Sequence, residues 1–312
     1  MIINSLEEVI FKKERRILIV NRLRSECLKC IGQKEIEKYP PTATEEEKIA
    51  YIKEVFNILV NAKPSDSGPS IAEKLNKLKL DMFNMENPYI KIKPYFNDFM
   101  MRFVDKVKAN LAKSENPLLL AIQYAMVGNY IDFGAVDNVK ESEIEKLLAE
   151  APGYELSSET FACLEKDLSE GQRMVFLTDN CGEIVMDKIL LETIRTQYPN
   201  LEISVLVRGE PVLNDATMVD AEQIGLTKEF FVMGNGSGVA GTSLERISKP
   251  ALDLINNADL VISKGQGNFE TLRMCGKNIY YVFLCKCEMF AKEFGVPRFT
   301  GMIVNEGECC HQ

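Results

Sequence analysis

Histidine is almost absent from this chain, and its scarcity excludes several kinds of catalytic site. The single histidine among the 312 residues is His311, next to the last residue. A Ser-His-Asp triad, a histidine phosphatase and an HExxH metal site each need a histidine within the active site. We therefore expect any acid-base chemistry to depend on carboxylates.

An excess of positive charge is also lacking. The chain has 37 Lys and Arg against 46 Asp and Glu, which gives a net charge of −9. A protein without a basic surface does not attract a phosphate backbone, so we expect no nucleic-acid partner. A small anionic substrate would need cations placed locally at its binding site.

Long apolar runs and a disulfide pattern are missing too. Runs such as ILIV at residues 17–20 are far shorter than a membrane span, and the N-terminus lacks the apolar segment of a signal peptide. We therefore expect a cytoplasmic protein without membrane contact. The nine cysteines are an odd number in a chain without an export signal, so they are expected to be reduced thiols or metal ligands.

The pattern of the chain changes near Gly171, from helical periodicity to alternating strands and helices. The predicted strands are Met174–Thr178, Glu202–Val207, Glu229–Met233, Asp259–Ser263 and Ile279–Leu284, with a short one near Met302–Val304. Such alternation predicts an α/β fold with helices on both faces of a mostly parallel sheet. We expect an all-helical domain over residues 1–168 that caps the site, followed by a Rossmann-like three-layer α/β/α domain over residues 169–312.

The stretch from Met174 to Leu190 predicts a buried strand, a tight turn and a helix. The turn contains Asp179, Asn180 and Glu183, at the edge where open α/β sheets bind ligands. Carboxylate and amide oxygens suit a hard cation, whereas the free N–H groups of a helix N-terminus suit an anion. The simpler interpretation is that Asp179 or Asn180 only caps the helix.

Two later strands end in equally polar loops. Arg208 and Asp215 follow the second predicted strand, and Lys264 and Asn268 follow the fourth, among glycines. Because the carboxyl ends of parallel strands meet at one edge of a sheet, these loops should converge. Singly, Asp215 is explained as a helix cap and Lys264 as a solvated surface residue. Together the residues predict one shared site.

These segments resemble the signature motifs of the damage-control phosphatase family, formerly called the domain of unknown function 89 group. The similar segments are DNCGE at 179–183, RGEPVLNDAT at 208–217, SKGQGNFE at 263–270 and, in the helical half, GNYIDFG at 128–134. The KGQGN form, together with Cys27-Leu28-Lys29-Cys30, resembles the prokaryotic subgroup of this family.

The resemblance implies roles for particular residues. It places a divalent metal on Asp179, Asn180 and Asp215, and a phosphate group beside Lys264 and Asn268. The resemblance of GNYIDFG leads us to assign Asn129 and Asp132 to the substrate as well. It also implies a phosphatase that acts on small, possibly damaged phosphorylated metabolites such as sugar phosphates.

Charge balance is consistent with this chemistry. A divalent cation held by Asp179 and Asp215 is formally neutral, so a phosphate dianion needs further positive partners, and Lys264 and Arg208 are the candidates. We expect Mg²⁺, Mn²⁺, Co²⁺ or Ni²⁺ as the cofactor, which would polarise a phosphoryl oxygen or lower the pKa of a bound water. Glu183 is the nearest carboxylate for proton transfer, and direct attack by Asp179 on phosphorus is the alternative.

Two other functions fit parts of the sequence. Residues 236–241 form a GxGxxG motif after the third predicted strand, and with a helix from Thr242 they would suit a dinucleotide. The acidic residue that should follow, Asp259, comes at the start of a strand instead of at its end. A non-catalytic regulatory protein that binds a nucleotide or phosphate is the other alternative, and turnover of an aryl phosphate would distinguish it from a phosphatase.

The cysteines suggest an additional, structural metal site. Cys27 and Cys30 have the spacing of metal ligands, and either Cys285 with Cys287 or the terminal group Cys309, Cys310 and His311 would complete a set of four. Ordinary thiols are the simpler interpretation.

Overall fold

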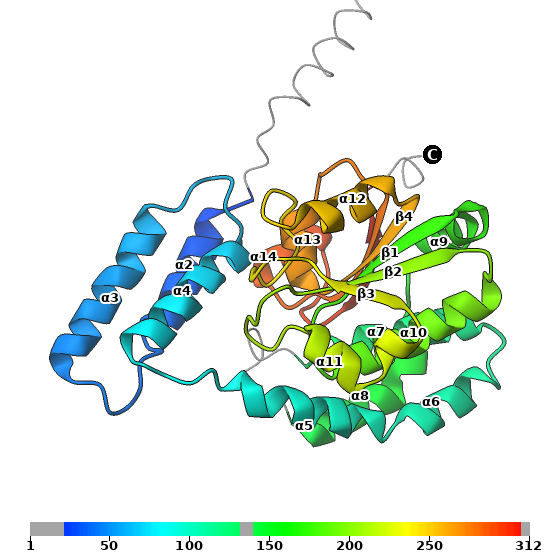
Figure 1. Cartoon of the computed structure of the whole chain (residues 1–312), viewed down its shortest axis with the longest axis horizontal. Helices are drawn as coiled ribbons and strands as arrows, with labels where there is room; N and C mark the ends of the chain where they lie inside the picture. Colours follow the sequence, from blue (N-terminus) through cyan, green and yellow to red (C-terminus); the bar gives the residue numbers. More distant parts are fainter. Residues whose placement is uncertain (1–21, 132–139, 307–312) are drawn as a thin grey trace, which may run out of the picture. The chain divides into compact units, whose positions relative to one another are not determined.

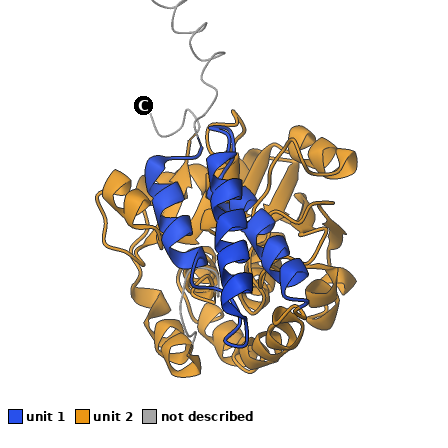
Figure 2. Cartoon of the chain, turned by 90° about the vertical axis from the view of Figure 1, so that its left-hand side faces the viewer, with its two compact units in different colours: residues 1–84 blue, residues 85–312 orange. Residues whose placement is uncertain are grey.

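The computed structural model describes residues 22–131 and 140–306, and the chain divides into two compact units. The first unit is Met1–Asn84 and the second is Met85–Gln312 (Figure 2). The predicted boundary between the two domains, at residues 168–169, lies just before the first strand, which begins at Arg173. The two compact units instead separate after Asn84. The reason is that the later helices of the predicted helical domain share one apolar core with the sheet.

In residues 22–84, the part of the first unit that the structure describes, three helices surround a small core of their own. The helices are α2 (Ser25–Glu35), α3 (Glu45–Val60) and α4 (Gly68–Met82). The core residues are Tyr51, Val55, Ile71 and Leu75. A capping box begins α3, where Thr44 N–H donates to Glu47 Oε2 at 2.8 Å and Glu47 N–H donates to Thr44 Oγ1 at 3.2 Å.

The second unit contains a six-stranded sheet in the order β3-β2-β1-β4-β5-β6 (Figure 1). The strands are β1 (Arg173–Leu177), β2 (Glu202–Val207), β3 (Phe231–Gly234), β4 (Leu260–Lys264), β5 (Ile279–Leu284) and β6 (Gly301–Asn305). All neighbours are parallel except β5 and β6, which are antiparallel. The predicted α/β fold with a mostly parallel sheet is confirmed.

Helices cover both faces of the sheet. Before the sheet come α5 (Tyr89–Met101), α6 (Val104–Leu111), α7 (Pro117–Gly128), α8 (Glu141–Glu150) and α9 (Ser158–Glu170). Between and after the strands come α10 (Glu183–Gln197), α11 (Met218–Gln223), α12 (Lys249–Asn257), α13 (Gln266–Leu272) and α14 (Glu288–Phe294). Short 3₁₀ turns lie at Ala151–Gly153 and Leu226–Lys228. In the described ranges, no helix has the length and apolar character needed to cross a membrane.

Strand alternation divides the apolar side chains between two cores. Phe176 and Ile262 belong to the core shared with α7 and α10, whereas Val175 and Val261 belong to the core beneath α12, α13 and α14. Successive side chains of a strand point to opposite faces. Because β4 continues to Lys264, this lysine has the same parity as Ile262 and points toward α7 and α10.

Candidate functional site

The candidate site lies between the carboxyl ends of β1 and β4, where the strand order reverses direction. Open α/β sheets bind ligands at such a switch point. Asp179 follows β1 by two residues, and Gly265 directly follows β4 with φ of +82°. A Cβ atom on Gly265 would lie 1.9 Å from Asp179 Oδ2. Glycine is therefore required here by the close approach of the Asp179 carboxylate.

The loop after β2 folds back over the loop after β1. Cys181 N–H donates to the Asn214 carbonyl at 2.8 Å, and Ala216 N–H donates to the Asp179 carbonyl at 2.7 Å. The Asn214 side chain also donates to Asn180 Oδ1 at 2.9 Å. These contacts bring Asp215 to the same edge as Asp179, as the sequence predicted.

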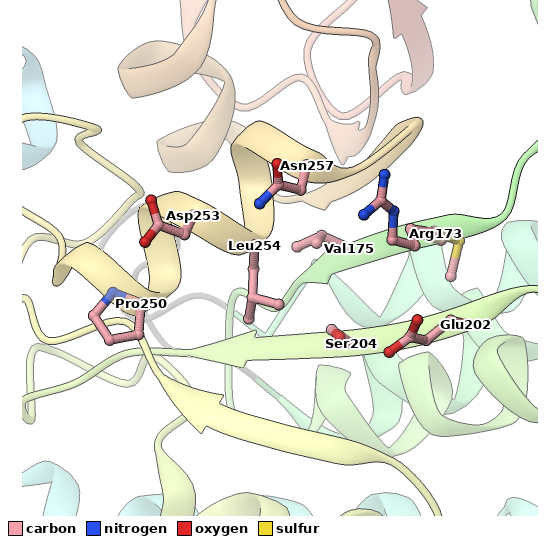
Figure 3. A pocket seen from close by; sticks show the side chains of 9 residues that line it. Arg173, Val175, Glu202, Ser204, Pro250, Asp253, Leu254 and Asn257 are labelled. Atoms are coloured by element: carbon pink, nitrogen blue, oxygen red, sulfur yellow. The ribbon is translucent and has the colours of Figure 1, made fainter.

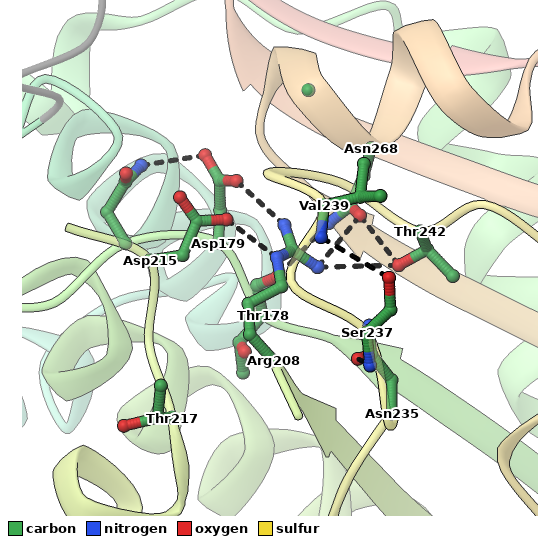
Figure 4. A network of polar contacts seen from close by, with 12 residues as sticks. Thr178, Asp179, Arg208, Asp215, Thr217, Asn235, Ser237, Val239, Thr242 and Asn268 are labelled. Atoms are coloured by element: carbon green, nitrogen blue, oxygen red, sulfur yellow. Dashed lines mark hydrogen bonds and ion pairs between the residues drawn. The ribbon is translucent and has the colours of Figure 1, made fainter. Parts of the chain in front are cut away.

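Arg208 connects the two aspartates. Its guanidinium donates to Asp179 Oδ1 at 3.2 Å and to Asp215 Oδ2 at 2.6 Å (Figure 4). Asp179 and Asp215 are only 6% and 4% exposed, and Arg208 is 1% exposed. In this dry environment the ion pairs are strong, and the arginine fixes the spacing of the two carboxylates.

Two asparagine side chains hold Asp179 from the other side. Asn129 Nδ2 donates to Asp179 Oδ2 at 3.0 Å and to Glu183 Oε2 at 2.9 Å. Asn180 Nδ2 donates to the same two oxygens at 2.7 and 2.9 Å. Each amide therefore bridges the carboxylates of Asp179 and Glu183. As placed here, Asn180 presents its N–H groups to Asp179 and its oxygen to Asn214.

Lys264 has a different environment from the phosphate contact that the sequence predicted. Its ammonium donates to Glu183 Oε1 at 2.6 Å, to Asp187 Oδ1 at 2.7 Å and to the Ala125 carbonyl at 2.9 Å. These bonds use all three donors of the group. Lys264, Glu183 and Asp187 are each 0% exposed. Lys264 and Glu183, both predicted to be catalytic, are thus turned inward and support Asp179.

Asn268, the other predicted phosphate ligand, is likewise engaged within the protein. Its Nδ2 donates to the carbonyls of Thr178 and Lys264, and its Oδ1 accepts from Arg208 Nη1 and Thr242 Oγ1 (Figure 4). The side chain therefore joins α13 to two strand ends and orients the guanidinium of Arg208. Asp132, also predicted to contact substrate, lies outside the described residues.

A second lysine, which the sequence analysis missed, acts on Asp179. Burial raises the pKa of Asp179 well above its usual value, and the carboxylates of Glu183 and Asp215 raise it further. The charges of Arg208 and Lys286 oppose this shift. Lys286 follows the end of β5, so it reaches the same edge of the sheet. The sequence could have indicated this role, because Lys286 lies between Cys285 and Cys287 directly after a predicted strand.

The chemistry of the cluster suits a hard divalent cation. Asp179 and Asp215 supply carboxylate oxygens, the type preferred by Mg²⁺ and Mn²⁺, and Asn180 lies beside them with its Oδ1 bonded to Asn214. Four buried carboxylates, Asp179, Glu183, Asp187 and Asp215, lie with three buried cations, Arg208, Lys264 and Lys286, so the cluster carries a surplus of negative charge. A cation would remove this imbalance.

The cysteine pairs belong to different units. Cys27 and Cys30 lie in α2, while Cys285 and Cys287 follow β5. Over residues 22–131 and 140–306, no three His, Cys, Asp or Glu side chains gather in a way that could hold a metal. A site combining the two pairs stays a prediction, and the terminal cysteines and His311 lie outside the described ranges.

The glycines of the GxGxxG motif have packing roles. A Cβ on Gly241 would lie 2.7 Å from the Gly267 carbonyl, and one on Gly209 would lie 2.2 Å from Gly236 N. Helix α12 begins at Lys249, so the helix predicted from Thr242 is wrong. The loop therefore packs closely against its neighbours and lacks the helix that a dinucleotide site requires after the glycines.

A separate cavity lies at the opposite edge of the sheet. It has a volume of about 280 Å³ and lies beside α12 and the first residues of β1 and β2 (Figure 3). Its polar lining includes Arg173, Glu202, Asp253 and Asn257. The cavity is at the amino ends of the strands and is distinct from the site around Asp179.

Comparison with known proteins agrees with this geometry. Residues 23–301 match the model of the damage-control phosphatase ARMT1-like domain. A damage-control phosphatase of Pyrococcus horikoshii is 30% identical over 283 residues, which cover 89% of this chain and 96% of the relative. An uncharacterized protein of Methanocaldococcus jannaschii is 30% identical over 88% of this chain and 92% of its own length.

The fold has a solved counterpart. The crystal structure of a DUF89 family protein from Pyrococcus horikoshii superposes with a TM-score of 0.76 at 26% identity, covering 91% of this chain and 99% of the other. The strand order, the site and the match over most of the chain lead to one conclusion. This chain belongs to the damage-control phosphatase ARMT1-like family.

Proposed function

We propose that this protein is a metal-dependent phosphatase that hydrolyses phosphate monoesters of small metabolites. The observation that carries the proposal is the pair of buried aspartates, Asp179 and Asp215, held at the switch point of the sheet by Arg208. Membership of the family, with a relative named as a damage-control phosphatase, supports the same chemistry.

The chain's own residues have distinct parts in this proposal. Asp179 and Asp215, with Asn180, would hold the divalent cation, which supplies Lewis-acid polarisation of a phosphoryl oxygen. Arg208 and Lys286 provide positive charge for the phosphate group. Since Glu183 is fully buried and paired with Lys264, proton transfer or direct attack falls to the aspartates that border the site.

The substrate class follows from charge and size. The net charge of −9 does not attract an anion to the protein as a whole. A phosphate monoester dianion would therefore be bound by the positive side chains at the site itself. We propose sugar phosphates and similar small phosphometabolites, including damaged ones, as substrates. Mg²⁺, Mn²⁺, Co²⁺ and Ni²⁺ are the proposed metals, and the cytoplasm is the proposed location.

A phosphometabolite panel tests the proposal. Purified protein is assayed with p-nitrophenyl phosphate and with sugar phosphates, with each of the four metals in turn and with EDTA. We expect turnover that requires added metal. Tight binding of Mn²⁺ and phosphate without any turnover would support the non-catalytic regulatory alternative instead.

A further inference from the structure

We propose that Asp187 is a positioning residue, which holds the ammonium of Lys264 and through it the carboxylate of Glu183. Glu183 in turn fixes the two amides that contact Asp179. The inference rests on the proposed function, because it assigns Asp187 a part in hydrolysis although it touches neither substrate nor metal.

Helix α10 places two acidic side chains on one face, within reach of Lys264. Glu183 and Asp187 are four residues apart in this helix, so their side chains lie on one face. Lys264 at the end of β4 donates to both, at 2.6 and 2.7 Å. One ammonium is thus clamped between two carboxylates in an interior where all three side chains are 0% exposed.

The two acids that pair with Lys264 leave a surplus of negative charge. A single ion pair between Lys264 and Glu183 would be neutral, whereas Asp187 adds a second acid that must be desolvated. Its Oδ2 is buried without a hydrogen-bond partner among the described residues. A buried oxygen without a hydrogen bond lowers stability. The bond that Oδ1 accepts from Lys264 is therefore the contact that gives Asp187 a role at this position.

Glu183 connects Lys264 to the two amides that contact Asp179. The ammonium of Lys264 occupies Oε1 of Glu183, which leaves Oε2 directed at the amides of Asn129 and Asn180. The same amides donate to Asp179 Oδ2. Without Asp187 the ammonium gains freedom to move, and Glu183 can rotate away from both amides.

Such indirect supports are a general feature of sites built on carboxylates. Residues that orient the direct ligands typically alter affinity or activity by roughly tenfold to a hundredfold when replaced. Asp187→Ala removes the acceptor, while Asp187→Asn keeps an oxygen at the Oδ1 position and provides the conservative rescue. Asp167→Asn is the matched control, because Asp167 accepts from Tyr280 and Asn278 at the far end of the sheet.

The experiment combines kinetics with hydrogen exchange. For the wild type and the three variants we measure kcat and KM with p-nitrophenyl phosphate and saturating Mn²⁺. Exchange of the side-chain amide hydrogens of Asn129 and Asn180 is followed by NMR. We expect Asp187→Ala to lower kcat by roughly tenfold to a hundredfold with KM nearly unchanged, and to accelerate amide exchange by a similar factor.

The controls separate positioning from general stability. Asp187→Asn should restore both readouts to near the wild-type values, and Asp167→Asn should change neither. Wild-type kcat and exchange in Asp187→Ala would overturn the inference, as would an Asp187→Asn variant as impaired as Asp187→Ala. If the wild type shows no turnover, the proposed function fails, and the exchange rates alone then decide the positioning role.

Discussion

Single residues at the end of β4 determine how the site is assembled. Gly265 allows Asp179 to approach the backbone, and Lys264 beside it carries the charge that stabilises Glu183. Gly265 thus acts on Asp179 and Lys264 on Glu183, the two carboxylates that the amides of Asn129 and Asn180 bridge. Each can be tested with a substitution that affects one contact.

Gly265→Ala should disrupt the site more than its backbone strain alone explains. The added Cβ would overlap the Asp179 carboxylate, which must then move. We expect Mn²⁺ affinity and kcat/KM to fall at least about tenfold, since displaced ligands cost activity. Gly276→Ala is the control, because Gly276 has φ of +74° and no atom within 4 Å of the added Cβ. Equal losses in both variants would show that strain alone is responsible.

Removal of the charge of Lys264 should affect stability, whereas removal of the charge of Lys286 should affect activity. Lys264→Met leaves Glu183 and Asp187 buried without a cation, so the free energy of unfolding should fall by roughly 3–5 kcal/mol. Lys286→Ala should chiefly lower kcat/KM, on the order of a hundredfold, because it removes positive charge from the proposed phosphate site. Urea unfolding and steady-state kinetics on both variants check this. A stable Lys264→Met variant with lost phosphate affinity would restore the sequence-based assignment.

Asp187 should make stability depend on pH. Burial raises its pKa to about 7, against the opposing charge of Lys264. Between about pH 4 and 7 the folded protein keeps a proton that the unfolded chain loses, so the free energy of unfolding contributed by this group falls as pH rises. Relative to Asp187→Asn, the wild type should therefore lose stability across this range. Parallel urea-unfolding profiles at pH 5 and 7.5 would contradict the assignment.

At the scale of elements, α5 fixes the start of α10. Gly182 precedes α10 with φ of +69°, and its N–H donates to Asn97 Oδ1 at 2.6 Å. Asn97 itself donates to Asp220 and Gln223, which lie in α11. Loss of this acceptor leaves a buried donor unsatisfied, which costs about 1–3 kcal/mol. We expect Asn97→Ala to show this loss in urea unfolding and faster exchange of the Gly182 amide, and an unchanged amide would refute the role.

The elements were largely predictable, because buried parallel strands are short apolar runs that end in turn residues. The directions of side chains at their ends were harder to predict. The fourth strand was predicted to end at Ser263, whereas β4 includes Lys264. One more residue places the lysine on the same face as Leu260 and Ile262, where it donates to Glu183 and Asp187. Alternation along the strand would have shown this direction had the strand been extended.

The structure brings the predicted site residues to one edge of the sheet, and several of them bond to one another there. Strand-end convergence brought Asp179, Arg208 and Asp215 together as expected. Asn129 and Asn268 were assigned to the substrate, yet their polar atoms bind protein groups. Sequence motifs identify which residues gather at a sheet edge. Whether a side chain contacts a ligand or a neighbouring side chain depends on packing against α7 and α13, which the spacing of residues does not specify.

At the scale of the whole molecule, the chain has two units with separate cores. Leu75 belongs to the core of the first unit, and Leu177 to a core of the second. Leu75→Ala should destabilise α2, α3 and α4 by about 2–5 kcal/mol while leaving hydrogen exchange in the sheet unchanged. Leu177→Ala should give the reverse pattern. Loss of protection throughout both units in Leu75→Ala would show that they unfold together.

The central claim is that Asp179 is the essential carboxylate of a metal-dependent phosphatase. The most direct measurement is the rate of p-nitrophenyl phosphate hydrolysis by Asp179→Asn at saturating Mn²⁺, beside the wild type with and without EDTA. We expect a loss of about a thousandfold or more in the variant, with its fold retained, and no wild-type activity in EDTA. Full activity in Asp179→Asn, or wild-type hydrolysis that persists in EDTA, would contradict the account.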